Sequence, residues 1–439
     1  MRTPIYDFLE KYAASGVARF HMPGHKGRGR LGAERYDITE ITGADNLYLA
    51  DGIIEESENN ATRLFGTAHT FYSTEGSTLA IKAMLKLATG KNKRILAARA
   101  VHKSFVYAAA LLDLDVEFIY GNDTCHYADS RISPDAVFAA LREHTPAAVY
   151  ITSPDYLGNI SDVEKIAELC HQFGTLLLVD NAHGAYLNFL NPSRHPIALG
   201  ADMCCDSAHK TLPALTGAAY LHISKMAPKD LVYAARGAMS LFASTSPSYL
   251  TMASLDLCNA YIEDSYSDRL KKTVSELFRV KRALGDAGIS FLDTEPLKLV
   301  LPLSQFNLTL SDFYDHLSKC NIEPEMIDSE YAVFMVSPEN TARELDRLSS
   351  SILSIPLNNG EKRDTPVGVI RPKRRVSIRE AVFSESERVA VADAVGRICA
   401  APTVACPPAV PIVISGEEID GQAASLFSHY GLQYVEVLR

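Results

Sequence analysis

The stretch Ser161-Asp-Val-Glu-Lys-Ile-Ala-Glu-Leu-Cys-His-Gln-Phe-Gly-Thr-Leu-Leu-Leu-Val-Asp180 contains a complete helix and a complete strand. Ser161 and Glu164 have the spacing of a capping box, and apolar residues then recur at helical spacing until Gly174 ends the helix. The apolar run that follows is typical of a strand buried on both faces. Asp180 is therefore expected at the carboxyl end of a parallel strand, where open α/β sheets bind ligands.

The same alternation extends over residues 71–223. Short apolar runs alternate with helix-length segments, which is the pattern of βαβ units around a mostly parallel sheet covered on both faces. Beyond this region the order of elements changes and predicts a smaller α+β domain. We expect an N-terminal segment over residues 1–44, a large α/β domain over residues 45–286 and a small C-terminal domain over residues 287–439.

Further elements follow from the same periodicities. Residues 77–88 have an apolar stripe and stop before Gly90, as a helix with a glycine after its end does. No Gly or Pro interrupts residues 249–284, which predicts one long helix or two in series. The other expected elements are strands 95–98, 203–205, 218–223, 297–301 and 331–336 and helices 311–320 and 341–353.

The composition excludes several classes of protein. Of the 439 residues 47% are hydrophobic, which is enough for a large core, and the net charge is −10 without a long basic run, so we expect no nucleic-acid partner. The eight cysteines form no CxxC pair, which indicates buried thiols and no metal site. Neither a signal core nor an apolar run of membrane-spanning length is present, so we expect a soluble cytoplasmic protein without a membrane partner.

Two glycine- or hydroxyl-rich segments suggest phosphate binding. Gly27-Arg-Gly-Arg-Leu-Gly32 matches the GxGxxG pattern, but no buried strand precedes it and no apolar helix follows, so we interpret it as a basic loop. A nucleotide-binding protein is the alternative that this motif alone would support. Ser73-Thr-Glu-Gly-Ser-Thr78 stands at a predicted helix start, where N–H groups and hydroxyls bind a phosphate. Ordinary capping of that helix by Ser or Thr is the alternative.

Lys210 ends the segment Asp206-Ser-Ala-His-Lys210, which follows the predicted strand 203–205. Asp180 precedes it by about one βαβ step, so both side chains can reach one cavity. An Asp facing a pyridinium nitrogen and a Lys forming a Schiff base are the groups that an enzyme dependent on pyridoxal 5'-phosphate (PLP) needs. A lone surface lysine is the alternative. His102 follows strand 95–98 and is either a structural histidine or a residue that stacks on the cofactor and moves protons.

Short motifs in a specific order run along most of the chain. They are Thr3-Pro-Ile-Tyr-Asp-Phe-Leu9, His21-Met-Pro-Gly-His-Lys-Gly27, Asp37-Ile-Thr-Glu40, Asp45-Asn-Leu-Tyr48, Gly76-Ser-Thr78, His102-Lys-Ser104, Asp180-Asn-Ala-His-Gly184, Ser207-Ala-His-Lys-Thr-Leu-Pro-Ala-Leu-Thr216, Thr245-Ser-Pro-Ser-Tyr249, Ala253-Ser-Leu-Asp256 and Arg379-Glu-Ala381. Together they resemble the bacterial ornithine/lysine/arginine decarboxylase family. The resemblance implies the PLP-dependent transferase fold (fold type I) and decarboxylation of arginine, lysine or ornithine to an amine and carbon dioxide.

The resemblance also implies residue roles. Lys210 would be the Schiff-base lysine, Asp180 the partner of the pyridine nitrogen and His102 the ring-stacking residue. The remaining cofactor-binding residues would be Gly76, Ser77, Thr78, Ala182, His183, Ser207 and His209, with Thr245 or Ser246 reaching the phosphate from the neighbouring subunit of a homodimer or larger assembly. An aminotransferase or β-eliminating lyase on the same fold, and a non-catalytic regulatory relative, are the alternatives.

The chain also departs from the family pattern. The family commonly has Glu where Asn181 stands and His where Tyr186 stands, and its Pro-Pro-Gly-Ile-Pro segment is here Pro407-Pro-Ala-Val-Pro411. The chain starts at once with the Thr3 motif, so it resembles the short members, which lack an N-terminal wing domain. For a basic substrate side chain, the family's C-terminal segment suggests Glu417 as the distal carboxylate, and a solvated surface acid is the alternative.

Overall fold

The computed structural model describes residues 1–121, 126–358, 370–402 and 409–439. It divides into two compact units, each made of several stretches of the chain. The first comprises residues 1–92, 147–150 and 163–268, and the second comprises residues 93–146, 151–162 and 269–439. The division into domains that the sequence suggests, with boundaries after residues 44 and 286, stays a prediction.

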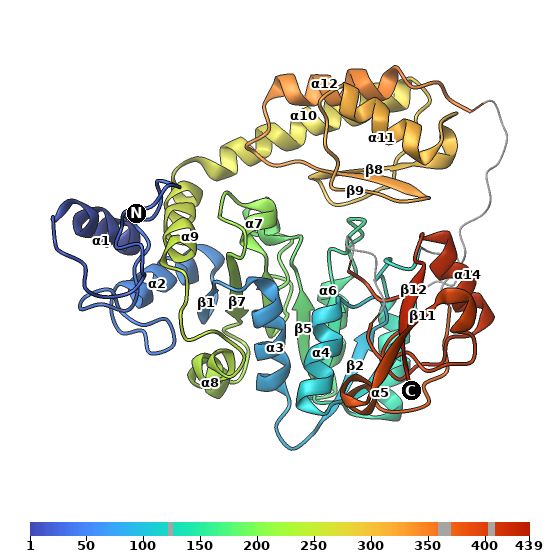
Figure 1. Cartoon of the computed structure of the whole chain (residues 1–439), viewed down its shortest axis with the longest axis horizontal. Coiled ribbons are helices and arrows are strands. Elements are labelled where there is room, and N and C mark those ends of the chain that lie inside the picture. Colours follow the sequence, from blue (N-terminus) through green and yellow to red (C-terminus); the bar gives the residue numbers. More distant parts are fainter. Residues whose placement is uncertain (122–125, 359–369, 403–408) are drawn as a thin grey trace. The chain divides into compact units, whose positions relative to one another are not determined.

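A seven-stranded sheet is the centre of the α/β fold, in the order β1-β7-β6-β5-β4-β2-β3 (Figure 1). β5 is parallel to β6, and β2 is parallel to β3, whereas β7 is antiparallel to both of its neighbours. The mostly parallel sheet predicted from the sequence is confirmed, with β7 as the strand that runs the other way. The strands are β1 (His69–Ser73), β2 (Arg94–Ala98), β3 (Asp115–Ile119), β4 (Ala148–Thr152), β5 (Leu176–Asp180), β6 (Met203–Asp206) and β7 (Ala219–Ile223).

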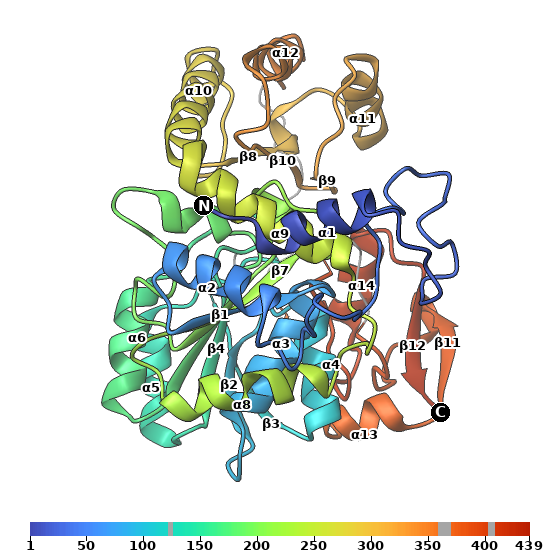
Figure 2. The ribbon, with the colours of Figure 1, turned by 90° about the vertical axis from the view of Figure 1, so that its left-hand side faces the viewer.

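The first unit holds the segments from which the candidate site is built. Its helix α3 packs against β6, β7 and α8, as Figure 2 shows for the two helices. Leu79, Ala83 and Met84 of the predicted apolar stripe of α3 are buried, and so is Leu85, which lies outside that stripe. The helices of this unit are α1 (Pro4–Ala14), α2 (Ile53–Phe65), α3 (Gly76–Ala88), α6 (Val163–Gln172), α7 (Ala208–Thr211), α8 (Lys229–Ser240) and α9 (Tyr249–Tyr261), with 3₁₀ helix η1 (Ala185–Phe189) and π-helix η2 (Ile262–Tyr266).

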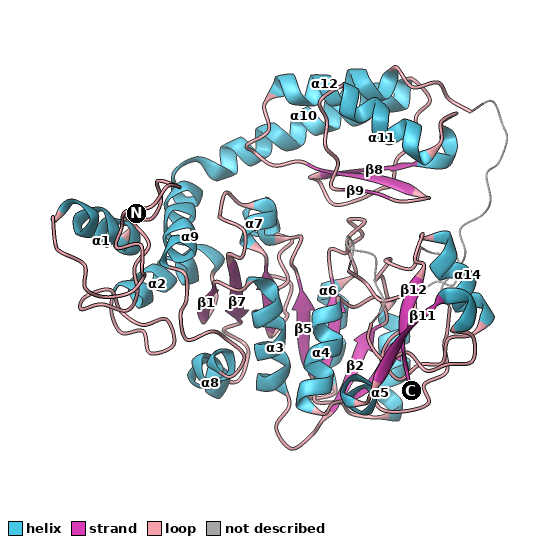
Figure 3. Cartoon of the chain, in the orientation of Figure 1, coloured by secondary structure: helices cyan, strands magenta, loops and turns pink. Residues whose placement is uncertain are grey.

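The second unit contains two smaller sheets, which Figure 3 shows in magenta. One has the order β8-β10-β9 and shares a core with α10, α11 and α12; the other pairs β11 with β12 and packs against α14. Its elements outside the large sheet are α4 (Lys103–Leu112), α5 (Pro134–Glu143), α10 (Ser267–Asp286), β8 (Lys298–Pro302), η3 (Leu303–Gln305), α11 (Leu310–Lys319), β9 (Met326–Ile327), β10 (Tyr331–Met335), α12 (Ala342–Leu353), α13 (Ile378–Phe383), β11 (Ser386–Ala390), η4 (Val391–Asp393), α14 (Gly421–His429) and β12 (Tyr434–Leu438). The first two residues of α10 belong to the first unit, which ends at Asp268.

Most predicted elements lie within a residue or two of their expected bounds. The long apolar segment after Tyr249 is two helices in series, α9 and α10, joined by a π-helical turn. The helix expected to begin at the Ser161 capping box begins instead at Val163. The Gly27–Gly32 motif lies outside helices and strands, as its interpretation as a loop requires. In the part of the chain that the structure describes, no helix has the length and apolar character needed to cross a membrane.

Candidate active site

The carboxyl ends of β5 and β6 carry two acidic side chains around which the site is built. Asp180 is the last residue of β5, and Asp206 is the last residue of β6. The strands are parallel, with Asp180 opposite Cys205, so both segments leave the sheet at the same edge. The short helix α7 follows β6 and carries Lys210. Asp180 and Lys210 therefore follow neighbouring strands, as their spacing predicts.

Lys210 contacts the turn that follows Asp180. Its Nζ lies 2.9 Å from Nε2 of His183, and His183 is only 5% exposed. Because His183 stands in the turn directly after β5, the contact brings the amine to the segment that starts with Asp180. The predicted pair of cofactor groups thus shares one edge of the sheet.

Asp180 is buried and is held by neutral donors. Its Oδ1 accepts hydrogen bonds from the Ala182 N–H at 3.1 Å and the Cys205 thiol at 3.5 Å, and its Oδ2 accepts one from the Tyr150 hydroxyl at 3.3 Å. Burial and the Asp180 charge raise the pKa of Tyr150 and that of Cys205 well above their ordinary values, so both stay protonated. Among the described residues, no lysine, arginine or histidine pairs with Asp180.

Asp206 has the imidazole partners that Asp180 lacks. Its Oδ2 lies 3.0 Å from Nε2 of His195 and 3.1 Å from Nε2 of His222, and all three side chains are fully buried. Burial alone would raise the pKa of Asp206, but the two histidines outweigh it and hold this pKa well below its ordinary value. Burial lowers the pKa of His222, against the attraction of Asp206. Ligand-type atoms of the three residues lie within 4.8 Å of one another, so the cluster also has the composition of a metal site, which the sequence did not indicate.

The start of α3 is the place where the sequence predicts phosphate binding. Gly76 begins the helix in a left-handed conformation, and the N-cap residue Glu75 makes no side-chain hydrogen bond to the first turn. The first N–H groups of a helix lack intrahelical partners and carry partial positive charge. Oγ of Ser207 lies 3.0 Å from Oγ of Ser77, so the segment before Lys210 adds a hydroxyl to this helix start. The alternative of a Ser or Thr at the N-cap position is wrong, because Glu75 occupies it.

These residues fit PLP in three respects. Lys210 supplies a primary amine that contacts the turn directly after the buried carboxylate of Asp180. A buried carboxylate without a cationic partner is costly, and the pyridinium N–H of PLP would supply the missing positive charge at Asp180. The start of α3, with Ser77 and Ser207, would hold the phosphate.

Two models of a known protein family match this chain. Residues 3–300 match the model described as "Orn/Lys/Arg decarboxylase, major domain", and residues 362–437 match "Orn/Lys/Arg decarboxylase, C-terminal domain". The chain belongs to the Orn/Lys/Arg decarboxylase family. It is a PLP-dependent amino-acid decarboxylase of fold type I, as the motif resemblance predicts.

Relatives of this decarboxylase span nearly all of its length. The arginine decarboxylase of Halalkalibacterium halodurans is 31% identical, covering 95% of this chain and 91% of the relative, and that of Bacillus subtilis is 28% identical with the same coverage. Among solved structures, lysine decarboxylase A from Pseudomonas aeruginosa superimposes with a TM-score of 0.80 at 18% identity, over 99% of this chain and 80% of that one. Alanine-glyoxylate aminotransferase from Nostoc sp. is more distant, with a TM-score of 0.55 at 17% identity, over 68% of this chain and 85% of that one. These two structural likenesses show the fold alone.

The other predicted cofactor residues of the decarboxylase lie in several places. His209 Nδ1 is 2.9 Å from the Ala218 carbonyl, and burial lowers the pKa of this histidine. Thr78 is the third residue of α3, and Thr245 and Ser246 are exposed in the loop between α8 and α9. In the second unit, His102 is the N-cap residue of α4, and its Nδ1 is 2.7 Å from Ser104 Oγ.

Glu417 has a partner of its own in the second unit. It is buried, and its Oε2 accepts hydrogen bonds from Arg99 Nη2 at 3.0 Å and the Ile414 N–H at 2.7 Å. Arg99 also donates to the carbonyls of Pro411 and Ile412. Burial raises the pKa of Glu417, although Arg99 opposes the shift. In this arrangement the carboxylate already neutralises one guanidinium, and a role in substrate recognition stays a prediction.

The departures from the family pattern have defined surroundings. Asn181 donates its side-chain N–H to Asp206 Oδ1 at 2.6 Å. Tyr186 is fully buried in η1. Ala409 has a left-handed backbone, and its carbonyl accepts the Lys103 N–H at 3.0 Å. Pro407 and Pro408, in the altered proline segment, lie outside the described residues.

Sequence reasoning missed the groups that surround the two carboxylates. Tyr150 lies in the middle of the apolar strand β4. A buried tyrosine hydroxyl needs a hydrogen-bond partner, so its position in this strand could have indicated a nearby polar group. The sequence placed Cys205 in strand 203–205 and Asp206 in the segment after that strand. It predicted no role in the site for either residue. His195 carries no local motif, because only the fold brings it to Asp206.

Proposed function

We propose that this protein is an arginine decarboxylase, which converts arginine to agmatine and carbon dioxide with PLP bound at Lys210. The observation that supports the site best is that Asp180 is a buried carboxylate to which, among the described residues, only neutral donors bond, in the segment that Lys210 contacts. Arginine is favoured over lysine and ornithine because the four relatives named arginine decarboxylase each cover 94–95% of this chain at 28–31% identity, whereas the lysine decarboxylase of Pseudomonas aeruginosa covers 64% at 23%.

Each residue has a defined task in this proposal. PLP, when bound, accepts the electron pair that remains on the substrate Cα when carbon dioxide leaves. The Asp180 carboxylate, which Ala182, Cys205 and Tyr150 hold in place, would face the pyridine nitrogen of the cofactor. Lys210 Nζ would hold the cofactor and would be the group that returns a proton to the substrate Cα.

The phosphate and the ring need further contacts. Ser77, Thr78, Ser207 and His209 would hold the phosphate with the start of α3, and His102 would stack on the ring. These assignments rest on the motif resemblance together with the Ser77–Ser207 contact.

We also propose a cytoplasmic homodimer in which Thr245 or Ser246 reaches the phosphate of the partner's site. Both residues are exposed, and the first unit also exposes large apolar side chains that a second copy would cover, including Phe20 and Tyr233, which are 94% and 93% exposed. Light scattering is expected to give twice the chain mass. Mixing two inactive variants, K210A and the double variant T245A/S246A, is expected to restore activity, because a mixed dimer has one intact site.

One experiment tests the reaction. PLP-loaded protein is incubated separately with arginine, lysine and ornithine, and carbon dioxide and amine are measured together, with K210A as the control. Equal amounts of carbon dioxide and agmatine, formed fastest from arginine, are expected. A keto acid instead of an amine would indicate an aminotransferase, and PLP binding without turnover of any substrate would indicate a regulatory relative; either result would overturn the proposal.

A further inference from the structure

Two hydrogen bonds tie the turn after β5 to the end of β6. Asn181, which directly follows Asp180, donates its side-chain N–H to Asp206 Oδ1 at 2.6 Å and its backbone N–H to the Cys205 carbonyl at 3.0 Å. Asn181 is fully buried, and its Oδ1 has no hydrogen-bond partner in the described part of the chain. The opposite amide orientation would place Oδ1 against the carboxylate, acceptor against acceptor. The bond to Asp206 therefore fixes the direction of this side chain.

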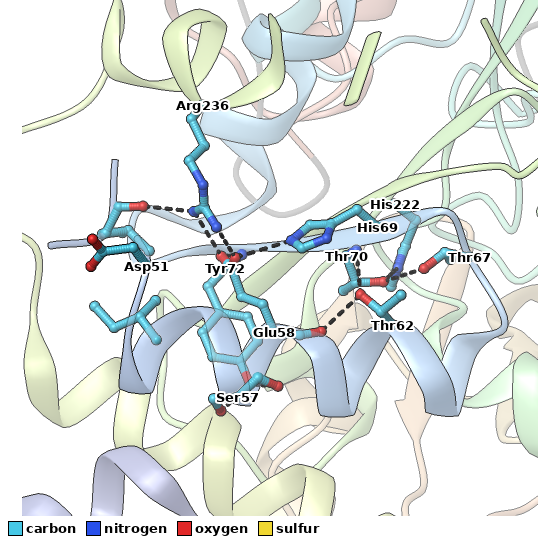
Figure 4. A network of polar contacts seen from close by, with 12 residues as sticks. Asp51, Ser57, Glu58, Thr62, Thr67, His69, Thr70, Tyr72, His222 and Arg236 are labelled. Carbon is cyan, nitrogen blue, oxygen red and sulfur yellow. Dashed lines mark hydrogen bonds and ion pairs between the residues drawn. The ribbon is translucent and has the colours of Figure 1, made fainter. Parts of the chain in front are cut away.

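Asp206 is in turn anchored by other elements of the first unit. His222 comes from β7 and His195 from the chain before β6, and both imidazoles face Oδ2. Figure 4 shows the next links: Nδ1 of His222 lies 2.9 Å from Oγ1 of Thr70 in β1, and Thr70 Oγ1 lies 2.8 Å from Oγ1 of Thr67. Because each member of this chain is buried and bonded to the next, the Asp206 carboxylate is a rigid acceptor for Asn181.

The tie lies between the two groups that hold the cofactor in the proposed function. Asp180 immediately precedes Asn181. Lys210 comes four residues after Asp206, in the short helix α7. A shift of the turn after β5 moves the Asp180 carboxylate, and the bond from Asn181 to Asp206 opposes that shift. Errors of about 1 Å in the placement of reacting groups cost enzymes about a hundredfold in rate.

We propose that Asn181 and Asp206 are positioning residues whose hydrogen bond sets the spacing between the Asp180 carboxylate and the Lys210 amine. Neither residue needs to touch substrate or cofactor in this role. The inference deepens the proposed function and rests on it. It also gives a physical reason for an amide at position 181: an acidic side chain here would face the Asp206 carboxylate at hydrogen-bond distance.

Variants of the pair test this inference through cofactor release. In N181A the bond is lost, and PLP is expected to dissociate about tenfold faster, with a similar fall in kcat and an unchanged KM. In N181D two carboxylates face each other, and release is expected to be faster still. In the exchanged pair N181D/D206N, donor and acceptor change places, so release is expected to return toward the wild-type rate.

A matched control separates positioning from loss of packing. Asn259 is also fully buried, and its Nδ2 also donates a 2.6 Å bond, to Tyr72 Oη, at a distance in sequence from the site. N259A is expected to lower thermal stability without changing the PLP release rate or the absorbance spectrum of the bound cofactor. N181A is expected to change both.

The outcomes are distinct. Unchanged PLP release in N181A, an equal increase in N259A, or an exchanged pair that releases PLP no more slowly than N181D would each overturn the inference while the wild-type enzyme still works. Wild-type protein that takes up no PLP would instead overturn the proposed function, and this inference with it.

Discussion

Asp180 and Asp206 end neighbouring parallel strands and are almost equally buried, yet their surroundings differ. Asp206 faces two histidines and an amide, whereas Asp180 faces a hydroxyl, a thiol and one backbone N–H. A buried charge is tolerated when it is paired, so Asp206 is satisfied within the chain, whereas in the proposed function the positive charge that pairs with Asp180 would come from the cofactor. Burial alone does not separate a structural carboxylate from a cofactor-binding one; the charge of its partners does.

Replacing Asp180 is expected to have the largest effect on activity. D180N keeps the shape but removes the negative charge beside the pyridine nitrogen, so decarboxylation is expected to slow by about 10³-fold. D206N is expected to cost about tenfold, because it acts only through position. Steady-state rates at saturating PLP give both numbers. Equal losses in the two variants would erase the functional difference between the carboxylates.

Glu417 extends the comparison to a buried carboxylate that is paired with a full cation. E417Q leaves Arg99 buried and uncompensated, so the free energy of unfolding is expected to fall by about 3 kcal/mol, with KM for arginine unchanged. Urea unfolding and initial rates measure the two quantities. If KM rises while stability is kept, Glu417 recognises the substrate side chain, and the pair with Arg99 is not its main role.

Asp256 is a fourth buried carboxylate, and it accepts hydrogen bonds from the N–H groups of Ile5 and Tyr6 and from the Ser57 hydroxyl. Burial is the main cause that raises its pKa to about 6, above the value near 3.9 of an unfolded chain. The folded state therefore keeps a proton that the unfolded state releases. Relative to D256N, the wild type is expected to lose about 3 kcal/mol of stability as the pH rises from about 4 to 7. Unfolding of both proteins at several pH values checks this, and a pH-independent difference contradicts it.

Tyr150 offers the smallest test of how Asp180 is held. Y150F removes one neutral donor at 3.3 Å, so the affinity for PLP is expected to fall by about fivefold, corresponding to about 1 kcal/mol. Y220F is the control, since Tyr220 is equally buried and donates to Asn259 Oδ1. Fluorescence titration of apoprotein with PLP measures the affinity. The same loss in both variants would assign the effect to packing.

Local patterns predicted the elements of this fold well. The apolar run before Asp180 and the stripe between Ser77 and Ala88 each produced the expected strand or helix, because burial of such patterns leaves few alternatives. The antiparallel direction of β7 was not predicted, because an apolar run indicates a buried strand but not whether that strand is parallel or antiparallel to its neighbours. The helix α6 starts at Val163, and the buried Ser161 hydroxyl has no hydrogen-bond partner among the described residues, so it does not cap this helix.

The chemistry of the site was predictable where it is carried by motifs. Asp180 and Lys210 each follow a predicted strand, and they are about one βαβ step apart in the sequence. Their position at the same edge of the sheet could therefore be predicted. The partners of the carboxylates were not predictable in this way, because Tyr150, His195 and His222 come from distant segments that only the folded sheet assembles. For Glu417 the motif indicated a carboxylate of interest, but it did not indicate that Arg99 is the ion-pair partner of this residue.

The N-cap side chain of α3 makes no hydrogen bond to the first turn of this helix, so in the proposed function the coenzyme would become part of the fold. A phosphate at that end would act as the missing cap, so vitamin B6 supply would shift the balance between native and denatured protein by mass action. In a starved cell we expect newly made chains to persist with a frayed first turn and to be degraded sooner than loaded ones. The abundance of the enzyme would then follow the nutritional state without any dedicated regulator.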